Sequence, residues 1–274
     1  MASLSVSIVF YHSSLEELRA TVESLRDSLA SARARGKLDH AALWLVDNGS
    51  DDMSLLDRVV IDALGGAQWI SLEVVRGQGN VGYGGGHDLA IKASRSDYHL
   101  VLNPDVIVSR PAIGEAIDYM ESNPAVGLLT PHVVNHEGER QYLCKRYPSV
   151  LVLLLRGFSP RRLRRRFEGL LHRYEMHDVP ENQIRVGIPI ATGCFMFARS
   201  NALHDLGGFS PKYFLYFEDF DLSLRLGRIA DVAYVPEVHI THSGGGAAKK
   251  GWTHRRLFMR SALTFFHDHG WKLW

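Results

Sequence analysis

Three acidic side chains fall within four residues, at Glu218, Asp219 and Asp221, directly after the aromatic-rich residues 213–217. Apolar residues at helical spacing follow, so the acids are predicted to lie in the first turn of a helix. A carboxylate there stays ionised beside the helix dipole and can accept a proton, and aromatic rings suit the apolar face of a sugar. The dipole alone favours acids here too, but it does not explain the aromatic residues. Glu218 and Asp219 diverge by about 100° around a helix, which argues against the facing acid pair of a glycosidase.

A second candidate carboxylate, Asp105, ends the Asn103-Pro104-Asp105 sequence that directly follows the apolar residues 99–102. At the carboxyl end of a strand it could hold Mg²⁺ or Mn²⁺ against the phosphate oxygens of a ligand. A simple turn that closes the strand explains the same residues. His239 and His242 are two further candidate metal ligands, although a single histidine is more often a packing or surface residue.

Residues 76–86 are rich in glycine and contain a GxGxxG pattern at Gly77, Gly79 and Gly82, between a predicted strand and a predicted helix. Glycines at this density indicate positive φ angles or close approach of the backbone to another group, and the helix start beyond them favours an anion. A dinucleotide-binding fingerprint normally occupies the first strand–helix turn, whereas two strand–helix units precede this one. A merely flexible loop is the remaining interpretation.

The segment 156–173 carries seven arginines against one glutamate, and five of the arginines lie in Arg161–Arg166. If this segment is helical, an apolar strip borders a guanidinium face, as expected of a helix lying on anionic lipid. The strip would consist of Leu163, Phe167, Leu170 and Leu171. A solvated basic face or an RNA-binding patch would account for the same charges.

The whole chain of 274 residues carries 31 Lys+Arg against 30 Asp+Glu, a net charge of +1. Because this gives no chain-wide cationic field, nucleic acid is not expected as a partner. The longest aliphatic run, residues 150–155, is far shorter than the ~20 residues of a membrane-spanning helix. The N-terminus alternates like a strand and lacks the basic region of a signal peptide. Cys144 and Cys194 have no CxxC spacing, which predicts a reducing, cytoplasmic location without a disulfide framework or a cysteine zinc site.

Alternating strands and helices must position these residues. Over the first hundred residues, strands are predicted at 5–10, 43–46, 70–75 and 98–102, with helices at 15–29, 55–64 and 88–94. This order predicts an α/β fold with a mainly parallel central sheet and helices on both faces. Such sheets bind ligands beyond the carboxyl ends of their strands, which places residues 10–12, 47–50, 76–86 and 103–105 along one rim.

The second half of the chain is less regular. Strands are predicted at 127–132, 193–198 and 233–235, and helices at 200–206 and 218–226. Residues 239–246 are predicted to follow a strand and to end in a mobile glycine loop. Neither a repeat nor a Pro/Ser-rich linker divides the chain, so residues 1–274 are predicted to form a single domain.

In their order along the chain, these segments resemble the family 2 inverting glycosyltransferases, and among them the bacterial rhamnosyltransferases of cell-surface polysaccharide assembly. The resemblance extends over nearly the whole chain, from residue 5 to about residue 243. The matching segments are Phe10-Tyr11, Val46-Asp47-Asn48-Gly49-Ser50, Asn80-Val81-Gly82-Tyr83-Gly84-Gly85-Gly86, Asn103-Pro104-Asp105, Ala191-Thr192-Gly193-Cys194-Phe195-Met196, Gly207-Gly208-Phe209 and Tyr216-Phe217-Glu218-Asp219-Phe220-Asp221-Leu222.

The resemblance implies a GT-A fold, with a nucleotide-binding half over residues 1–106 and an acceptor-binding half over residues 107–274 that includes the basic segment 156–173. It implies that Asp219 is the general base, that Asp47 recognises the base or ribose, and that a divalent metal is held by Asp105 and His242 rather than by His239. The implied nucleotide-sugar-binding residues are Phe10, Tyr11, Asp47, Asn80, Gly82, Gly84, Asn103 and Asp105. The implied acceptor-binding residues are Thr192, Gly193, Tyr216 and Glu218.

The implied reaction is inverting transfer of L-rhamnose from dTDP-L-rhamnose to a hydroxyl of a glycan or of a polyprenyl-diphosphate-linked acceptor. It would take place at the inner face of the cell membrane, contacted through Arg161–Arg166. Direct displacement at an anomeric carbon needs a base on the incoming hydroxyl and a metal for the departing diphosphate, but no covalent nucleophile. Two alternatives remain: an NAD-dependent oxidoreductase that uses the GxGxxG pattern, and a non-catalytic adaptor that docks on membranes. The sequence leaves the oligomeric state open, a homodimer included.

Overall fold

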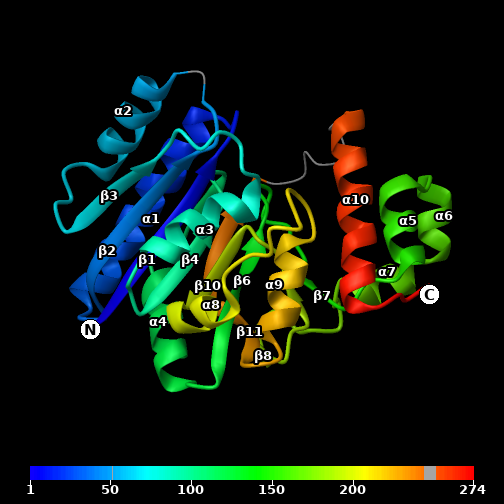
Figure 1. Ribbon diagram of the computed structural model, residues 1–274. Coiled ribbons are helices and arrows are strands. Elements are labelled where there is room, and N and C mark those ends of the chain that lie inside the picture. The colour runs from blue at the N-terminus through cyan, green and yellow to red at the C-terminus, as the bar shows by residue number, and fades with distance from the viewer. Residues whose placement is uncertain (51, 244–250) are drawn as a thin grey trace.

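The central sheet of the molecule has the strand order β3-β2-β1-β4-β10-β6-β11-β5 (Figure 1). The computed structural model describes residues 1–50, 52–243 and 251–274. The first four strands along the chain are mutually parallel and are β1 (Ala2–Phe10), β2 (Leu38–Asp47), β3 (Ile70–Val75) and β4 (Tyr98–Leu102). The helices between them are α1 (Leu15–Ala34), α2 (Met53–Leu64) and α3 (Tyr83–Ala93). The predicted alternation of strands and helices is therefore confirmed, with β2 and α1 longer than expected.

Beyond β4 the sheet becomes mixed. Strand β10 (Phe195–Arg199) is antiparallel to both β4 and β6 (Val126–Val134), and β6 pairs in parallel with β11 (Asp231–His242). The short strands that the sequence analysis did not predict are β5 (Val106–Val108), β7 (Cys144–Lys145), β8 (Arg185–Val186) and β9 (Ile190–Ala191). Because β11 continues to His242, both His239 and His242 lie on this strand instead of after it. The predicted glycine loop at residues 244–246 lies outside the described residues.

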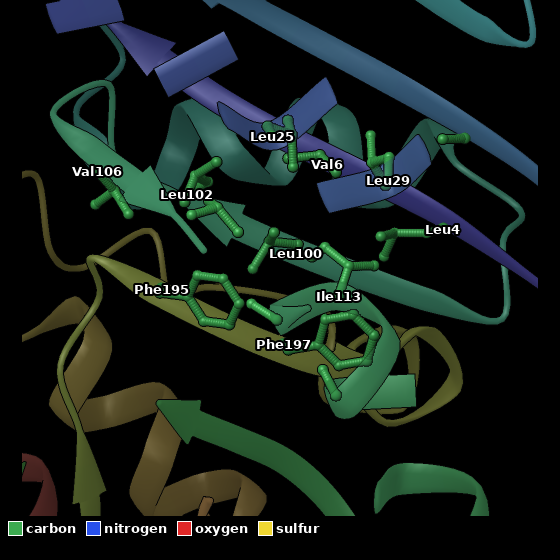
Figure 2. Packing of buried hydrophobic residues seen from close by; sticks show 14 of the residues in the cluster. Leu4, Val6, Leu25, Leu29, Leu100, Leu102, Val106, Ile113, Phe195 and Phe197 are labelled. Atoms are coloured by element: carbon green, nitrogen blue, oxygen red, sulfur yellow. The ribbon is translucent and has the colours of Figure 1, made fainter. Parts of the chain in front are cut away.

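Helices cover both faces of the sheet, as predicted. Helices α1, α2 and α4 (Ala112–Ser122) lie on one face, and their apolar residues form the main core with alternate residues of β1 and β4, including Leu4, Val6 and Leu100 (Figure 2). Helices α3, α8 (Ser200–Leu206) and α9 (Glu218–Leu226) contribute to a second core on the opposite face.

A buried hydrogen-bonded chain ties α3 to the sheet. Ser7 of β1 contacts Nδ1 of His87 on α3 at 2.7 Å and Nε2 of His99 on β4 at 2.8 Å, and Ser5 contacts Nδ1 of His99 at 2.6 Å. Burial lowers the pKa of both imidazoles, so the two rings stay neutral. Both nitrogens of His99 contact hydroxyl groups, whereas Nε2 of His87 has no partner among the described residues. These contacts fix the helix that follows the glycine-rich segment.

Four helices form a separate lobe beside α9 (Figure 1). They are α5 (Val150–Phe158), α6 (Arg161–Arg166), α7 (Glu168–Tyr174) and α10 (Trp252–His269). The basic segment is thus divided between separate helices, because Phe167 leaves helical geometry at φ −110° between α6 and α7. The apolar strip expected along one continuous helix is therefore interrupted. Within the described residues, no helix has the length and apolar character needed to span a bilayer.

The glycine-rich segment is shorter than expected, because α3 begins at Tyr83 and includes Gly84, Gly85 and Gly86. Its glycines allow close approach to the protein's own chain. A Cβ on Gly82 would lie 2.2 Å from the carbonyl oxygen of Phe214, and one on Gly84 would lie 2.9 Å from Cβ of Phe209. Gly82 also has φ 81° and ψ 178°, a region populated almost only by glycine.

We therefore expect Gly82→Ala to lower the free energy of unfolding by about 3 kcal/mol, from backbone strain and the clash with Phe214. Gly85→Ala is the matched control, because its Cβ would meet only Val81, at 3.5 Å. That variant should be about 0.5 kcal/mol more stable than the original chain, since alanine is the better helix former. Urea unfolding of both variants measures the difference, and equal stabilities would contradict this account of Gly82.

Candidate active site

Asp219 lies in the first turn of α9, beside the chain that enters β10. Its Oδ2 accepts the Gly193 N–H at 2.9 Å, and its Oδ1 accepts the Phe220 N–H at 2.9 Å. Burial raises the pKa of Asp219 to about 6, although these backbone hydrogen bonds favour its ionised form. The carboxylate is therefore ionised at neutral pH and basic enough to accept a proton from a hydroxyl.

Glu218 is more deeply buried than Asp219, and its Oε2 has no hydrogen-bond partner among the described residues. Burial and the adjacent charge of Asp219 raise the pKa of Glu218 well above its usual range, so it holds a proton when Asp219 is ionised. The hydroxyl of Thr192, next to Gly193, is also buried and unpartnered within the described chain. Together these two side chains offer free hydrogen-bonding groups beside the Asp219 carboxylate.

The backbone that leads into α9 is unusual. Tyr216 and Phe217 have φ values of 71° and 67°, so two consecutive non-glycine residues are left-handed. Such conformations are strained and persist only where packing holds them. Helix α10 supplies this packing: Phe258 contacts both rings, and His254 hydrogen-bonds the Tyr216 hydroxyl at 3.0 Å. The orientation of the acidic turn thus depends on α10.

Tyr83, the first residue of α3, connects this acidic turn to the end of β4. Its hydroxyl donates to Oδ1 of Asn103 at 3.0 Å and lies against the carbonyl oxygen of Gly193. Burial raises the pKa of Tyr83 well above its usual value, and the negative charges of Asp219 and Asp105 raise it further. Asp105 and the acidic turn, which are far apart along the chain, therefore both influence one phenol.

Asp105 follows β4 and faces the end of β11. Its buried Oδ1 makes no hydrogen bond within the described residues and lies 3.5 Å from Nε2 of His242. Burial disfavours the charged form, but His242, a backbone N–H and Asn103 together outweigh it, and the pKa of Asp105 is lowered overall. Gln141 orients the imidazole, since its Oε1 is 3.1 Å from Nδ1 of His242 and its Nε2 donates to the His242 carbonyl at 2.9 Å. His239 instead packs against His132, with ring centroids 5.1 Å apart.

Asp47, at the end of β2, is held by hydrogen bonds from the residues that directly follow it. Oδ1 accepts the N–H groups of Gly49 and Ser50, at 3.0 and 2.7 Å, and Oδ2 accepts the Ser50 hydroxyl at 2.6 Å. Despite partial burial, these hydrogen bonds and the charge of Arg76 lower the pKa of Asp47. Asp47 is thus a fixed carboxylate whose Oδ2 keeps accepting capacity for a further donor.

The glycine-rich segment is anchored to the same end of β2. Asn48 donates from Nδ2 to the carbonyl of Gly82 at 2.9 Å, and Oδ1 of Asn80 accepts the Gly82 N–H at 2.9 Å. Tyr11 lies nearby on the surface, with Cε2 3.8 Å from the position of a Cβ on Gly49. The side chain of Phe10, by contrast, is buried in the main core, which leaves only its backbone at the rim.

The structure therefore brings most of the predicted site residues to one rim of the sheet, around Tyr83 and the ends of β2, β4 and β11. Gly82 and Gly84 belong to this rim but turn toward Phe214 and Phe209. Sequence reasoning did not single out Tyr83, Gln141 or His254. Tyr83 could have been noticed as the one aromatic residue of segment 76–86, whereas Gln141 and His254 carry no local signal.

The sequence matches the family model Glycosyl transferase family 2 over residues 5–207. It is 26% identical over 183 residues to N-acetylglucosaminyl-diphospho-decaprenol L-rhamnosyltransferase of Mycobacterium tuberculosis (strain ATCC 25618 / H37Rv), covering 64% of this chain and 57% of that protein. It is 26% identical over 219 residues to Rhamnosyltransferase WbbL of Escherichia coli (strain K12), covering 74% of this chain and 73% of that protein. The chain thus spans 57% of the length of the mycobacterial relative.

Among solved structures, residues 1–349 of S. aureus TarS in complex with UDP superpose with a TM-score of 0.56 at 15% identity, over 96% of this chain and 65% of that one. GalNAc-T7 with UDP, GalNAc and Mn²⁺ superposes with a TM-score of 0.61 at 14% identity, over 88% of this chain and 43% of that one. These similarities are of fold alone, and they confirm the predicted GT-A arrangement.

Proposed function

Because this chain belongs to glycosyl transferase family 2, whose model it matches over residues 5–207, we propose that it transfers a sugar, with inversion, from a nucleotide diphosphate donor to an acceptor hydroxyl. L-Rhamnose from dTDP-L-rhamnose is the proposed donor, in keeping with the names of its curated relatives. The proposed acceptor is a glycan or a polyprenyl-diphosphate-linked sugar. Residues 1–106 form the proposed nucleotide-binding half and residues 107–274 the proposed acceptor-binding half.

The observation that carries this proposal is the carboxylate of Asp219, whose pKa is raised to about 6 and which is fixed by the Gly193 N–H. The neighbouring Thr192 hydroxyl and Glu218 Oε2 are buried and have no partner among the described residues. Asp219 takes the proton of the attacking hydroxyl, while the protonated Glu218 and Thr192 orient the acceptor by hydrogen bonds. Attack on the face opposite the departing diphosphate inverts the anomeric carbon. The step needs no covalent enzyme intermediate.

Asp105 and His242 are the proposed ligands of a divalent metal, Mg²⁺ or Mn²⁺. Oδ1 of Asp105 is buried without a hydrogen bond among the described residues and lies 3.5 Å from Nε2 of His242, so the two side chains offer the oxygen and nitrogen donors that suit such an ion. Within the described residues, no cluster of three or more ligating side chains is present, so water and donor phosphates would complete the coordination. When bound, the metal would neutralise charge on the departing diphosphate.

At the opposite end of the site, Asp47, Asn80, Gly82, Gly84, Asn103 and the Phe10–Tyr11 backbone form the proposed donor-binding rim. The anionic inner face of the cell membrane is the proposed location, contacted through Arg161–Arg166.

A panel of nucleotide sugars, tested for slow donor hydrolysis with and without EDTA, examines the proposal without knowledge of the acceptor. We expect hydrolysis of dTDP-L-rhamnose above that of UDP- and GDP-sugars, and its loss with EDTA. Hydrolysis of a different nucleotide sugar would support the transferase activity but would contradict dTDP-L-rhamnose as the donor. Stabilisation by NADH, with none by any nucleotide sugar in a thermal-shift assay, would favour the oxidoreductase instead.

A further inference from the structure

Positive charge is concentrated in the helical lobe, defined as residues 150–174 and 251–274. These two segments contain eleven arginines and lysines against two acids, a net charge of +9. The remainder of the chain contains 20 basic against 28 acidic residues, a net charge of −8. Although the net charge of the whole chain is near zero, the charge is unevenly distributed, and the lobe is the cationic end of the molecule.

The exposed arginines of the lobe are Arg156, Arg162, Arg164, Arg165, Arg166, Arg173, Arg255, Arg256 and Arg260, and most of them have no counter-charge among the described residues. Arg162, Arg164, Arg165 and Arg166 on α6 are exposed and form no ion pair with any described residue. The same holds for the exposed Arg255, Arg256 and Arg260 on α10. Like charges gathered in this way repel each other, so an anionic partner would stabilise the arrangement.

An apolar surface lies within the same lobe. Helices α5 and α10 enclose a groove lined by Val150, Leu153, Leu154, Phe258, Met259, Ala262, Leu263, Phe266 and Trp271. Leu154, Met259 and Leu263 on its rim are 44–53% exposed. Helix α6, with its exposed arginines, lies next to α5, and the exposed arginines of α10 are on the second helix of the groove.

Three of the five tryptophans of the chain are exposed on this lobe, namely Trp252, Trp271 and Trp274. The C-terminal segment that carries two of them is held in place, because the N–H groups of Val150 and Leu151 donate to the carbonyls of Lys272 and Leu273 at 2.8 and 3.1 Å. Trp271 also stacks on Phe266, with ring centroids 5.2 Å apart. Exposed tryptophans beside an apolar groove and unpaired arginines are typical of a surface that enters the interface of a lipid bilayer.

We propose that the groove between α5 and α10, with the exposed tryptophans and the arginines of α6 and α10, docks on the surface of an anionic lipid bilayer. Charge complementarity favours lipid over a second copy of the chain, whose lobe would bring an equal positive charge. This proposal extends the contact through Arg161–Arg166 to an apolar insertion surface, and the docking does not depend on the chemistry of the site.

The consequence for the acceptor does rest on the proposed function. Helix α10 presents Met259 and Leu263 outward, and on its inner side Phe258 and Phe265 pack against Phe217, immediately before Glu218. One helix thus joins the docking surface to the turn that carries Asp219. An acceptor anchored in the bilayer would therefore reach the base from the side of this lobe.

Co-flotation with vesicles tests the docking surface in the full chain. We expect binding to vesicles of phosphatidylcholine mixed with phosphatidylglycerol and not to phosphatidylcholine alone. Changing Arg162, Arg164, Arg165 and Arg166 to serine should weaken binding about a hundredfold or more, since each cation near an anionic surface contributes to affinity. The control changes Arg58, Arg110, Arg185 and Arg228, all exposed outside the lobe, to serine and should bind as the original chain does.

The apolar part is tested by Met259→Ser, Leu263→Ser and Trp274→Ser together, which should weaken binding about tenfold and remove the salt-resistant fraction. Met53→Ser, Ile61→Ser and Ile229→Ser form the control, because these apolar side chains are 51–58% exposed outside the lobe. Equal lipid binding by the lobe variants and the control variants would overturn the proposal. It would also be overturned if light scattering showed a dimer, and the apolar triple variant abolished this dimer without loss of lipid binding. Donor hydrolysis without lipid, measured on the same variants, reports on the proposed reaction alone.

Discussion

Replacement of Asp219 by asparagine should reduce sugar transfer by about 10²- to 10⁴-fold, the contribution expected of a general base. Asparagine keeps the shape of the side chain and an oxygen that can accept the Gly193 N–H, so binding of the nucleotide sugar should remain near that of the original chain. Initial rates and donor affinity by calorimetry separate these two effects. Asp205→Asn, an exposed change on α8, is the control for the loss of one acidic group.

The pKa of Asp219, about 6, fixes the direction of the pH dependence. The carboxylate is the reactive form, so kcat/KM should rise with pH through about 6 and then level off. Because burial raises the pKa of this group in the folded chain, its ionisation at neutral pH disfavours folding, and Asp219→Asn should unfold at an equal or higher temperature. If Asp219→Asn retained its transfer activity, Asp219 would not be the general base. If its biological activity persisted without any sugar transfer, the non-catalytic adaptor would be favoured.

The parallel half of the fold was readable from the sequence because its signals are local. Helices α1 and α2 each bury one face, so apolar spacing and a capping residue such as Ser14 mark them within a few positions. Strands β1 and β4 are buried along nearly their whole length and are visible as short runs rich in apolar residues. The short strands β5, β7, β8 and β9 have two or three residues each, too few to show a period. Their conformation is set by the neighbouring strands with which they pair.

The residues of the candidate site likewise differ in whether a local sequence signal marks them. Asp105 and Asp219 stand at element boundaries, where turn residues and helix-start acids are visible in the sequence. Gln141 and His254 act only through contacts with residues about 100 and 38 positions away, His242 and Tyr216. The glycines were recognised as sites of close approach, but only the folded chain shows that Gly82 and Gly84 approach Phe214 and Phe209. Long-range partners of this kind leave no pattern in a single sequence.

The second large effect is expected at the proposed metal ligands. Asp105→Asn should lower the transfer rate about a hundredfold or more, because a metal supplies several kcal/mol of charge stabilisation on a departing diphosphate. His242→Ala should weaken Mn²⁺ binding about tenfold, since it removes one of two protein ligands, and added Mn²⁺ should partly restore its rate. Titration of the protein with Mn²⁺, followed by the electron paramagnetic resonance of the free ion, measures binding independently of activity.

His239→Ala is the matched control, because His239 lies on the same strand three residues before His242 but packs against His132. It should bind Mn²⁺ and turn over as the original chain does. If His239→Ala and His242→Ala weakened Mn²⁺ binding equally, the ion would be held by general charge instead of by the pair at the end of β11. If neither variant changed Mn²⁺ binding while EDTA still stopped the reaction, the metal ligands would lie outside the Asp105–His242 pair. The 3.5 Å approach of these two side chains would then have only a structural role at the end of β11.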